Sequence, residues 1–538
     1  MVVAAGCSRG PETPGVCEVA AQSGAVANGD SILLGSIGDA SNLIPMRAGD
    51  SASHEVAGRI FDGMLAYDRD LGGLEPRLAE RWEVSEDGRE ITFYLRKDVR
   101  WQDGEPFTAR DVEFGFNTIT DPATLTAYAE DYLQVSRFEV LDDHTFRVTY
   151  DKPYAPALAT WGSMVVLPRH LLEGKNINEA TEFARNPVGL GAYKLESWET
   201  KRQITVLAND EYYRGRPHID RVVTRILPDQ QTQFLELKSG GLDMMGLTPL
   251  QFTRQTETAD FTRNIRKFNY LGNGYTYLGY NLLREPFTDV RVRRALTHAI
   301  DKNEIVSAVL LGRGKPAVSP YKPGTRWFND QVNDPQYDPE KARALLAEAG
   351  WTDSDGDGIL DKDGKPFRFE IITNNGNEQR AKTATIIQRR LREIGVAVEV
   401  RTIEWAAFIN DFVDKKNFDA VVLGWSLDPD PDQYIIWHSS KTEPKQFNFI
   451  SFDNAEVDEL LEAGRRTFDA DKRKEAYDRF QEILVEEQPY TFLYYPESLP
   501  ALHCRFQGIE PAAAGIAYNF KDWYVPQSLQ KYAMTASP

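Results

Sequence analysis

One segment of this chain combines a buried strand with side chains that suit a small ligand. Residues 418–423 (FDAVVL) are apolar enough for a buried parallel strand, and Gly424, Trp425, Ser426 and Asp428 follow directly. Ligands in open α/β sheets bind at the carboxyl ends of the strands. Glycine lets another backbone approach, tryptophan offers an apolar wall, serine can bond a peptide group and aspartate can accept from an amine. The pattern predicts a binding site for a cationic ligand, with an ordinary carboxylate in an Asp-Pro turn as the alternative.

A second segment has the carboxylate spacing of a calcium loop. Acidic residues stand at loop positions one, three, five and nine, and glycine stands at position six. Position twelve is Gly364 instead of a bidentate glutamate, and a strand is expected after the loop where a calcium-binding hand has a helix. The candidate ligands are Asp353, Asp355, Asp357 and Asp361. We interpret this segment as an acidic surface turn and expect no cofactor; in the alternative, calcium would fix this loop away from the main ligand.

Motifs of several common enzyme classes are absent from the sequence. There is no G-x-G-x-x-G after a strand, no G-x-x-x-x-G-K-[ST] and no H-E-x-x-H. The seven histidines are scattered, whereas a metal or acid–base site needs such groups to converge. His438 beside Ser439 and Ser440 is interpreted as structural, because adjacent loop residues seldom share a catalytic geometry. We therefore expect no enzyme.

Length, charge and cysteine content narrow the class of protein further. At 538 residues the chain exceeds the about 250–300 residues over which one hydrophobic core grows, so at least two lobes are expected. The formal net charge of −19 argues against a nucleic-acid partner, which basic patches would bind. The sequence has no apolar stretch of roughly 18 residues that could span a membrane. Three cysteines predict neither a disulfide framework nor a cysteine-rich metal site.

The N-terminus suggests a lipid anchor. Small residues before Cys7 (VVAAGC) resemble the lipobox of bacterial lipoproteins, which is cut before a cysteine that is then acylated. The charged region and apolar core of a complete signal are missing, so residues 1–29 are interpreted as a truncated signal and tether. Residues 8–29 are rich in Gly, Ala, Ser, Pro and Thr, as in a flexible linker. An incidental cysteine on a floppy N-terminus is the alternative.

Hydrophobic periodicity and turn signals predict an α/β chain that positions these segments. Two hairpins, over residues 82–95 and 138–148, flank a helix that Thr108 caps. Strands and helices then alternate from residue 367 to 423 in the order β-α-β-α-β, which favours a parallel sheet with right-handed crossovers. Two more helices are expected, over residues 455–468 and 472–487.

The most specific segment of the chain is YNLLREPFTDVRVRRALTHAIDK, from residue 280 to 302. It predicts a strand, a Pro-Phe turn and a helix capped by Asp289. It also resembles the signature of family-5 extracytoplasmic solute-binding proteins, whose members include dipeptide- and oligopeptide-binding receptors of ABC importers. Further matches in the family's order are LEPRLAERW from residue 74, VRWQDGEPFTARDV from 99, GLGAY from 189 and DPDPDQY from 428. The resemblance covers roughly residues 30–530.

The resemblance implies a two-lobe, periplasmic-binding-protein-like (type II) α/β fold with an extra β-rich subdomain in lobe one. Lobe one would comprise residues 30–279, with the subdomain at about 66–200, and lobe two residues 280–493. Residues 494–538 would return to lobe one. Two chain crossings, near Gly279–Asn281 and near Tyr494–Pro496, would then form a hinge.

The resemblance also assigns roles to the candidate site. In similar peptide receptors an aspartate at the position of Asp428 holds the ligand's N-terminal ammonium, and an aromatic residue at the position of Trp405 lines the side-chain pockets. The oligopeptide receptor carries an arginine two residues before its Gly-Trp, where this chain has Val422. A ligand group that such an arginine would hold is therefore in doubt.

The expected function is an extracytoplasmic receptor that delivers peptides to an inner-membrane ABC permease with ATPase subunits. The protein would be a periplasmic or extracytoplasmic monomer, attached to the membrane only by a lipid at Cys7. Relatives of such receptors bind nickel chelates, haem, opines or oligosaccharides, so a non-peptide solute is the first alternative. A hydrolase that uses carboxylates in the same cleft, and a lipid-tethered assembly protein without a small ligand, are the others.

Overall fold

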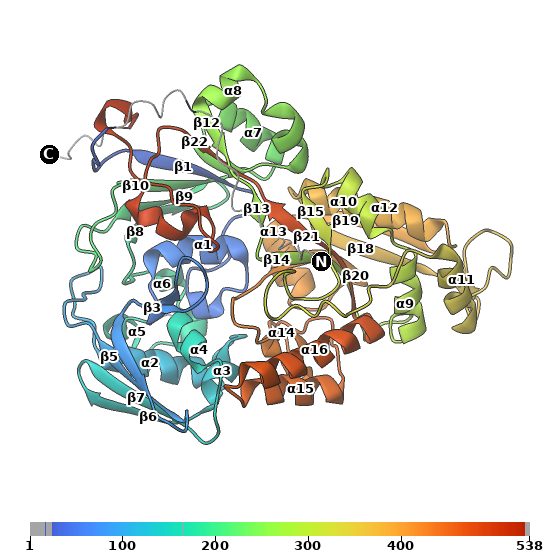
Figure 1. The fold of residues 1–538 in the computed structure, drawn as a ribbon, viewed down its shortest axis with the longest axis horizontal. Coiled ribbons are helices and arrows are strands. Elements are labelled where there is room, and N and C mark those ends of the chain that lie inside the picture. Colours follow the sequence, from blue (N-terminus) through green and yellow to red (C-terminus); the bar gives the residue numbers. More distant parts are fainter. Residues whose placement is uncertain (1–16, 18–23, 165, 533–538) are drawn as a thin grey trace, which may run out of the picture.

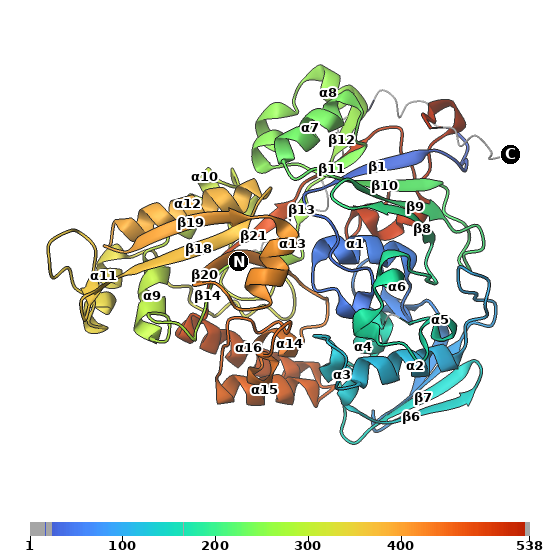
Figure 2. The same ribbon diagram turned by 180° about the vertical axis from the view of Figure 1, so that it is seen from behind.

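The computed structural model describes residues 17, 24–164 and 166–532, which form two lobes lying side by side (Figure 1). Each lobe contains a seven-stranded sheet, and a four-stranded sheet belongs to the first lobe. The view from behind shows this smaller sheet on the side of the first lobe away from β1 (Figure 2). In the part of the chain described, no helix is both long and apolar enough to cross a membrane. Cys7, the expected lipidation site, lies outside the described residues.

The large sheet of the first lobe has the strand order β12-β22-β11-β1-β10-β9-β8. β1 pairs in parallel with β10 and β11, and the remaining pairs are antiparallel. Ile32 and Val206 of the sheet pack with Val56 and Ile60 of α1 in one core, so this helix covers the sheet with its apolar stripe. The strands are β1 (Ser31–Ser36), β8 (Tyr193–Glu199), β9 (Gln203–Ala208), β10 (Arg221–Ile226), β11 (Met244–Gly246), β12 (Ile265–Lys267) and β22 (Pro500–His503). The helices beside them are α1 (Ser51–Ile60), α7 (Gln230–Ser239) and α8 (Ala259–Asn264).

The four-stranded sheet has the order β4-β5-β7-β6, with every neighbour antiparallel, so both predicted hairpins are confirmed. The helix predicted between them is α2, which begins after Thr108 with a capping box: the Thr108 amide donates to Asp111 at 2.9 Å. The sheet comprises β4 (Ala79–Val84), β5 (Glu90–Leu95), β6 (Val135–Asp142) and β7 (Thr145–Tyr150). Around it lie β2 (Leu65–Tyr67), β3 (Leu74–Pro76), α2 (Ala109–Thr120), α3 (Ala129–Leu133), α4 (Ala157–Ser163), α5 (Arg169–Leu172) and α6 (Thr181–Arg185).

The sheet of the second lobe runs in the order β13-β21-β14-β20-β18-β19, with β15 beside β21. β18 pairs in parallel with β19 and with β20, as the β-α-β-α-β order predicts. Alternate residues of β20 enter two different cores, Val422 with α9, α11 and α12, and Val421 with α15 and α16. Both faces of the sheet are therefore covered, which explains the unbroken apolar run of this strand.

The strands of this lobe are β13 (Tyr270–Leu271), β14 (Gly274–Tyr280), β15 (Gly314–Pro316), β18 (Arg368–Asn374), β19 (Ala397–Ile403), β20 (Ala420–Ser426) and β21 (Tyr490–Ser498). A two-stranded ribbon comprises β16 (Asp361–Lys362) and β17 (Lys365–Pro366). The helices are α9 (Val290–His298), α10 (Lys302–Ala308), α11 (Pro339–Glu348), α12 (Glu378–Arg392), α13 (Trp405–Ala407), α14 (Tyr434–Trp437), α15 (Ala455–Arg465) and α16 (Ala470–Glu487).

The chain passes between the two large sheets at two places. β12 ends at Lys267 in the first sheet and β13 begins at Tyr270 in the second, and β21 ends at Ser498 just before β22 returns to the first sheet. The segments expected to form the hinge instead lie inside β14 and β21, where Tyr280 and Tyr495 are fully buried. They are core strands of the second sheet because β14 pairs along its length with β20 and β21.

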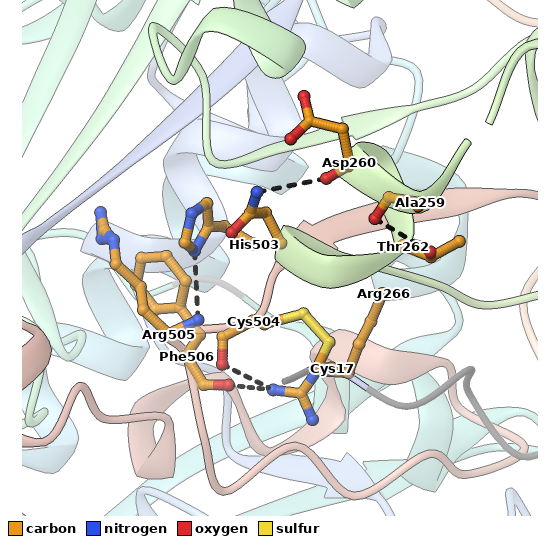
Figure 3. The surroundings of a disulfide bond; sticks show 10 residues. Cys17, Ala259, Asp260, Thr262, Arg266, His503, Cys504, Arg505 and Phe506 are labelled. Carbon is orange, nitrogen blue, oxygen red and sulfur yellow. Dashed lines mark hydrogen bonds between the residues drawn. A yellow bond between two sulfur atoms is a disulfide. The ribbon is translucent and has the colours of Figure 1, made fainter. Parts of the chain in front are cut away.

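A disulfide joins Cys17 to Cys504, across a separation of 487 residues (Figure 3). Both half-cystines are buried, and the guanidinium of Arg266 donates to the carbonyls of Cys504 and Phe506 beside the bond. The expectation that three cysteines form no disulfide framework therefore misses this bond, because so large a separation leaves no spacing to recognise. Part of the expected tether also contacts the folded body, since the Gly29 amide donates to the carbonyl of His218 at 2.9 Å.

Candidate ligand-binding site

The predicted site follows β20 on the side of the second lobe that faces the first. Asp428 belongs to the loop after β20, and its charge helps to raise the pKa of Tyr67 and of Tyr128, although burial is the larger cause in both. Both tyrosines belong to the first lobe, so the Asp428 carboxylate is near enough to that lobe for its charge to act on them. The structure thus places the residue where a ligand held between them would lie.

Asp428 is the uncompensated acid of its loop. Its side chain is exposed and has no hydrogen-bond or ion-pair partner among residues 17, 24–164 and 166–532. The surrounding protein nevertheless raises its pKa by desolvation, and the nearby charge of Asp430 adds to the effect. The other two acids of the loop are paired: Asp430 accepts from Arg473 at 2.9 Å and Asp432 from Arg465 at 2.6 Å.

Aromatic rings bridge the two lobes beside this carboxylate. The ring centroid of Trp425 lies 5.4 Å from that of Phe447, which lies 5.5 Å from that of Tyr128 in the first lobe. Trp405 also reaches across: its Nε1 donates to the Asp50 carboxylate at 3.4 Å, and a Cβ added to Gly38 would lie 2.7 Å from its ring. Both tryptophans are half-buried, so each keeps apolar surface that a ligand can cover.

Gly424 and Ser426 differ in what they contribute. Ser426 is exposed at the end of β20, and its hydroxyl makes no hydrogen bond to another described residue, so it is available to a ligand. Gly424 instead makes room for the protein's own groups, because an added Cβ would lie 2.8 Å from the Tyr275 carbonyl oxygen and 2.9 Å from the guanidinium of Arg380. The expected close backbone approach is therefore that of β14, and the second contact identifies a cation that the sequence analysis missed.

Arg380 is a guanidinium without a carboxylate partner among the described residues. It stands in the first turn of α12 and donates to the Asn374 side chain at 2.9 Å. Burial lowers its pKa, and the phenols of Tyr494 and Tyr277 partly oppose this effect. The amide of Glu378, two residues earlier, donates to Gln230 of the first lobe at 3.0 Å, so this end of the helix faces the gap between the lobes.

Arg380 supplies a cation on the face of β20 where the similar oligopeptide receptor carries an arginine and this chain has Val422. Val422 and Gly424 share a face of the strand because side chains alternate with period two. The arginine expected at position 422 is absent, but the Arg380 guanidinium lies over Gly424 on that same face. The sequence did not identify it, because Arg380 and Gly424 are far apart in the chain and meet only through the fold.

The acidic loop brings together three of its four predicted ligands. Carboxylate oxygens of Asp353, Asp355 and Asp357 all lie within 4.8 Å of one another, and all three residues are exposed. Asp361 is turned to Ser354, whose amide and hydroxyl donate to it at 2.9 and 2.7 Å. The predicted set of four carboxylates is thus incomplete, because Asp361 belongs to the β16–β17 ribbon.

Known proteins resemble this chain in both sequence and structure. A family model described as bacterial extracellular solute-binding proteins, family 5 middle, matches residues 73–446. The oligopeptide-binding protein AppA of Bacillus subtilis is 32% identical over 507 residues, which cover 92% of each chain. Its structure in complex with a nonapeptide has a TM-score of 0.88 and 31% identity, and the match covers 93% of this chain and 100% of that one.

Two further solved structures show the range of ligands among similar chains. DppA of Helicobacter pylori, in complex with the peptide STSA, has a TM-score of 0.84 at 27% identity and covers 93% of this chain and 99% of its own. NikZ of Campylobacter jejuni, in complex with Ni(L-His), has a TM-score of 0.83 at 27% identity, and the match covers 92% of this chain and 99% of NikZ. DppA is described as a periplasmic binding protein associated with an ABC transporter.

Proposed function

The chain belongs to the bacterial extracellular solute-binding proteins of family 5, and we propose that it binds peptides between its lobes and delivers them to an ABC permease. The expected two-lobe type II fold is confirmed by its likeness to AppA and DppA. Both of those structures hold a peptide, which favours peptides over the nickel chelate held by NikZ.

The observation that carries the proposal is the unpaired carboxylate of Asp428 between the lobes. A peptide's ammonium would supply the missing counter-charge and form a charge-assisted hydrogen bond. Ser426 and the backbone at the end of β20 offer further polar groups, and Trp425 offers an apolar wall. Recognition through the main chain and the termini tolerates many side chains, as a nutrient receptor requires.

Arg380 gives the proposed peptide a second charged partner. A peptide is a zwitterion, and the site offers one unpaired anion and one cation without a carboxylate. Gly424, which Arg380 touches, lies four residues from Asp428, a span of at most about 14 Å in an extended chain. That span matches peptides of about two to five residues at roughly 3.3 Å per residue. We therefore propose that Asp428 holds the ammonium and Arg380 the carboxylate of short peptides.

The proposed setting is outside the cytoplasm, with a permease and its ATPase subunits as partners. The Cys17–Cys504 bond supports this setting, because disulfides persist in oxidising compartments. With those two cysteines paired, Cys7 is the third and remaining one, as lipidation at that residue requires. The lipid anchor, the monomeric state and closure of the first lobe on the second are parts of the same proposal.

Calorimetry with two probes tests the proposed ligand class. Trialanine carries both termini and no distinctive side chain, and Ni(L-His) represents the chelate class. We expect saturable binding of trialanine and none of the nickel complex, and native mass spectrometry of the purified protein should show a carried-over peptide. Binding of Ni(L-His) without binding of trialanine would overturn the proposal.

A further inference from the structure

We propose that two consecutive acids of α3, Glu130 and Asp131, form a latch with Lys441 and Arg465 that holds the lobes closed. Lys441 Nζ lies 2.8 Å from Glu130 Oε2, and Arg465 Nη2 lies 2.6 Å from Asp131 Oδ1. The acids belong to the first lobe and the cations to the second, and α3 lies next to α15 in both views (Figures 1 and 2). These four residues are called the latch below. The inference uses the proposed function only in that a ligand is held between the lobes.

The latch is shielded from water on its cationic side. The side chains of Lys441 and Arg465 are 9% and 3% exposed, whereas those of Glu130 and Asp131 are each 19% exposed. Charges that are screened little by solvent interact more strongly than surface pairs do. A third bond crosses at the same place, since the Ala155 amide donates to the carbonyl of Arg465 at 2.8 Å.

Each half of the Arg465–Asp131 pair is held within its own lobe. Arg465 donates to both oxygens of Asp432, and its guanidinium carbon lies 3.8 Å from the centroid of the Tyr434 ring. Asp131 accepts from the Tyr154 hydroxyl at 3.1 Å. Because both groups are fixed before they meet, little side-chain entropy is lost when the lobes close. A chance surface pair would lack this support.

The latch is also connected to the loop that carries the ligand carboxylate. Asp432, which orients Arg465, and Asp428 stand four residues apart, with prolines at 429 and 431 that restrict the backbone between them. A ligand that orders Asp428 therefore orders the acceptor that positions Arg465. This makes Arg465 and Asp131 positioning residues: they do not touch the ligand, but they set the closed population on which its affinity depends.

The test compares Glu130→Gln/Asp131→Asn with wild type and with Asp103→Asn. The control removes a carboxylate in the same lobe, where Asp103 accepts from His170 at 2.7 Å, so no bond to the second lobe is lost. Small-angle scattering gives the radius of gyration of each protein alone and with saturating trialanine, and stopped-flow tryptophan fluorescence gives the dissociation rate of trialanine. Circular dichroism checks that all three are folded.

We expect a larger radius of gyration for the double variant, alone or with trialanine, and dissociation about 10- to 100-fold faster than in wild type. The control should match wild type in both. Reversing the charges of the Glu130–Lys441 pair, by combining Glu130→Lys with Lys441→Glu, should bring the radius of gyration and the dissociation rate of trialanine part of the way back to wild type from the values of Glu130→Lys alone. Equal radii and equal rates in the double variant and wild type would overturn the latch. If trialanine fails to bind wild type, the proposed function fails, and the ligand-free radii alone decide for or against the latch.

Discussion

Replacing Asp428 should weaken peptide binding without weakening the fold. Asp428→Ala removes the carboxylate, and Asp428→Asn keeps its size and an acceptor oxygen but not its charge. The side chain makes no bond to another described residue, so neither change removes a structural contact. Because desolvation and Asp430 raise its pKa, the ionised carboxylate opposes folding at neutral pH. The thermal midpoint of both variants should therefore equal or slightly exceed that of wild type.

The size of the effect follows from the position of the carboxylate. Truncating one partner of a buried, hydrogen-bonded charge pair costs about 2–5 kcal/mol in binding. Asp428 is exposed before the ligand arrives, which favours the lower end of that range. At about 1.4 kcal/mol per decade, Asp428→Ala should weaken trialanine binding by roughly 30- to 100-fold, with Asp428→Asn between it and wild type.

Calorimetry of the three proteins with trialanine measures these affinities, and the pH dependence adds a second test. A bound ammonium favours the ionised carboxylate, so binding to wild type should weaken as the pH falls through the raised pKa of Asp428. Asp428→Asn should lose this dependence. Affinities within twofold of one another across the three proteins would refute the role of Asp428.

Three further predictions concern other parts of the molecule. Arg380→Met should weaken the binding of trialanine by about 10- to 100-fold. Binding of trialanine amide should stay unchanged, because this peptide has no C-terminal carboxylate for Arg380 to hold. An equal loss of affinity for both peptides would contradict the assignment. Burial raises the pKa of Asp414 to about 6, so its ionised form destabilises the fold above that pH. At about pH 7.5, denaturant unfolding of Asp414→Asn should show a free energy of unfolding about 1–2 kcal/mol higher than that of wild type, a value lowered to allow for the partial exposure of the side chain. This difference should vanish below about pH 4, where Asp414 is protonated in both the folded and the unfolded wild type. A difference that does not change with pH would contradict this cause. Cys17→Ala/Cys504→Ala should lower the free energy of unfolding by about 2–4 kcal/mol, and a reductant should lower that of wild type but not of the variant.

Local signals predicted the elements well. The Thr108 capping box, the Asp289 cap of α9 and the apolar run before Gly424 each depend on residues that are near neighbours in the chain. The alternating strands and helices after residue 367 likewise fixed a parallel arrangement, because such connections have one favoured hand. These features need no knowledge of the rest of the molecule.

Features that depend on distant segments were not predictable in this way. Cys17 and Cys504 meet only through the fold, and Arg380 gains its importance from the strand that it covers. The hinge position was misplaced because a buried core strand and a strand that crosses between lobes have the same apolar composition. Asp361 left the predicted calcium set because strand pairing turned it towards Ser354.

The central claim is that the free carboxylate of Asp428 holds a peptide's ammonium. The most direct measurement is calorimetry of wild type with trialanine and with N-acetyl-trialanine, which differ only in that charge. The acetylated peptide should bind roughly 30-fold or more weakly, and its remaining affinity should be nearly the same for Asp428→Ala as for wild type. Equal affinity of wild type for the two peptides would contradict the claim.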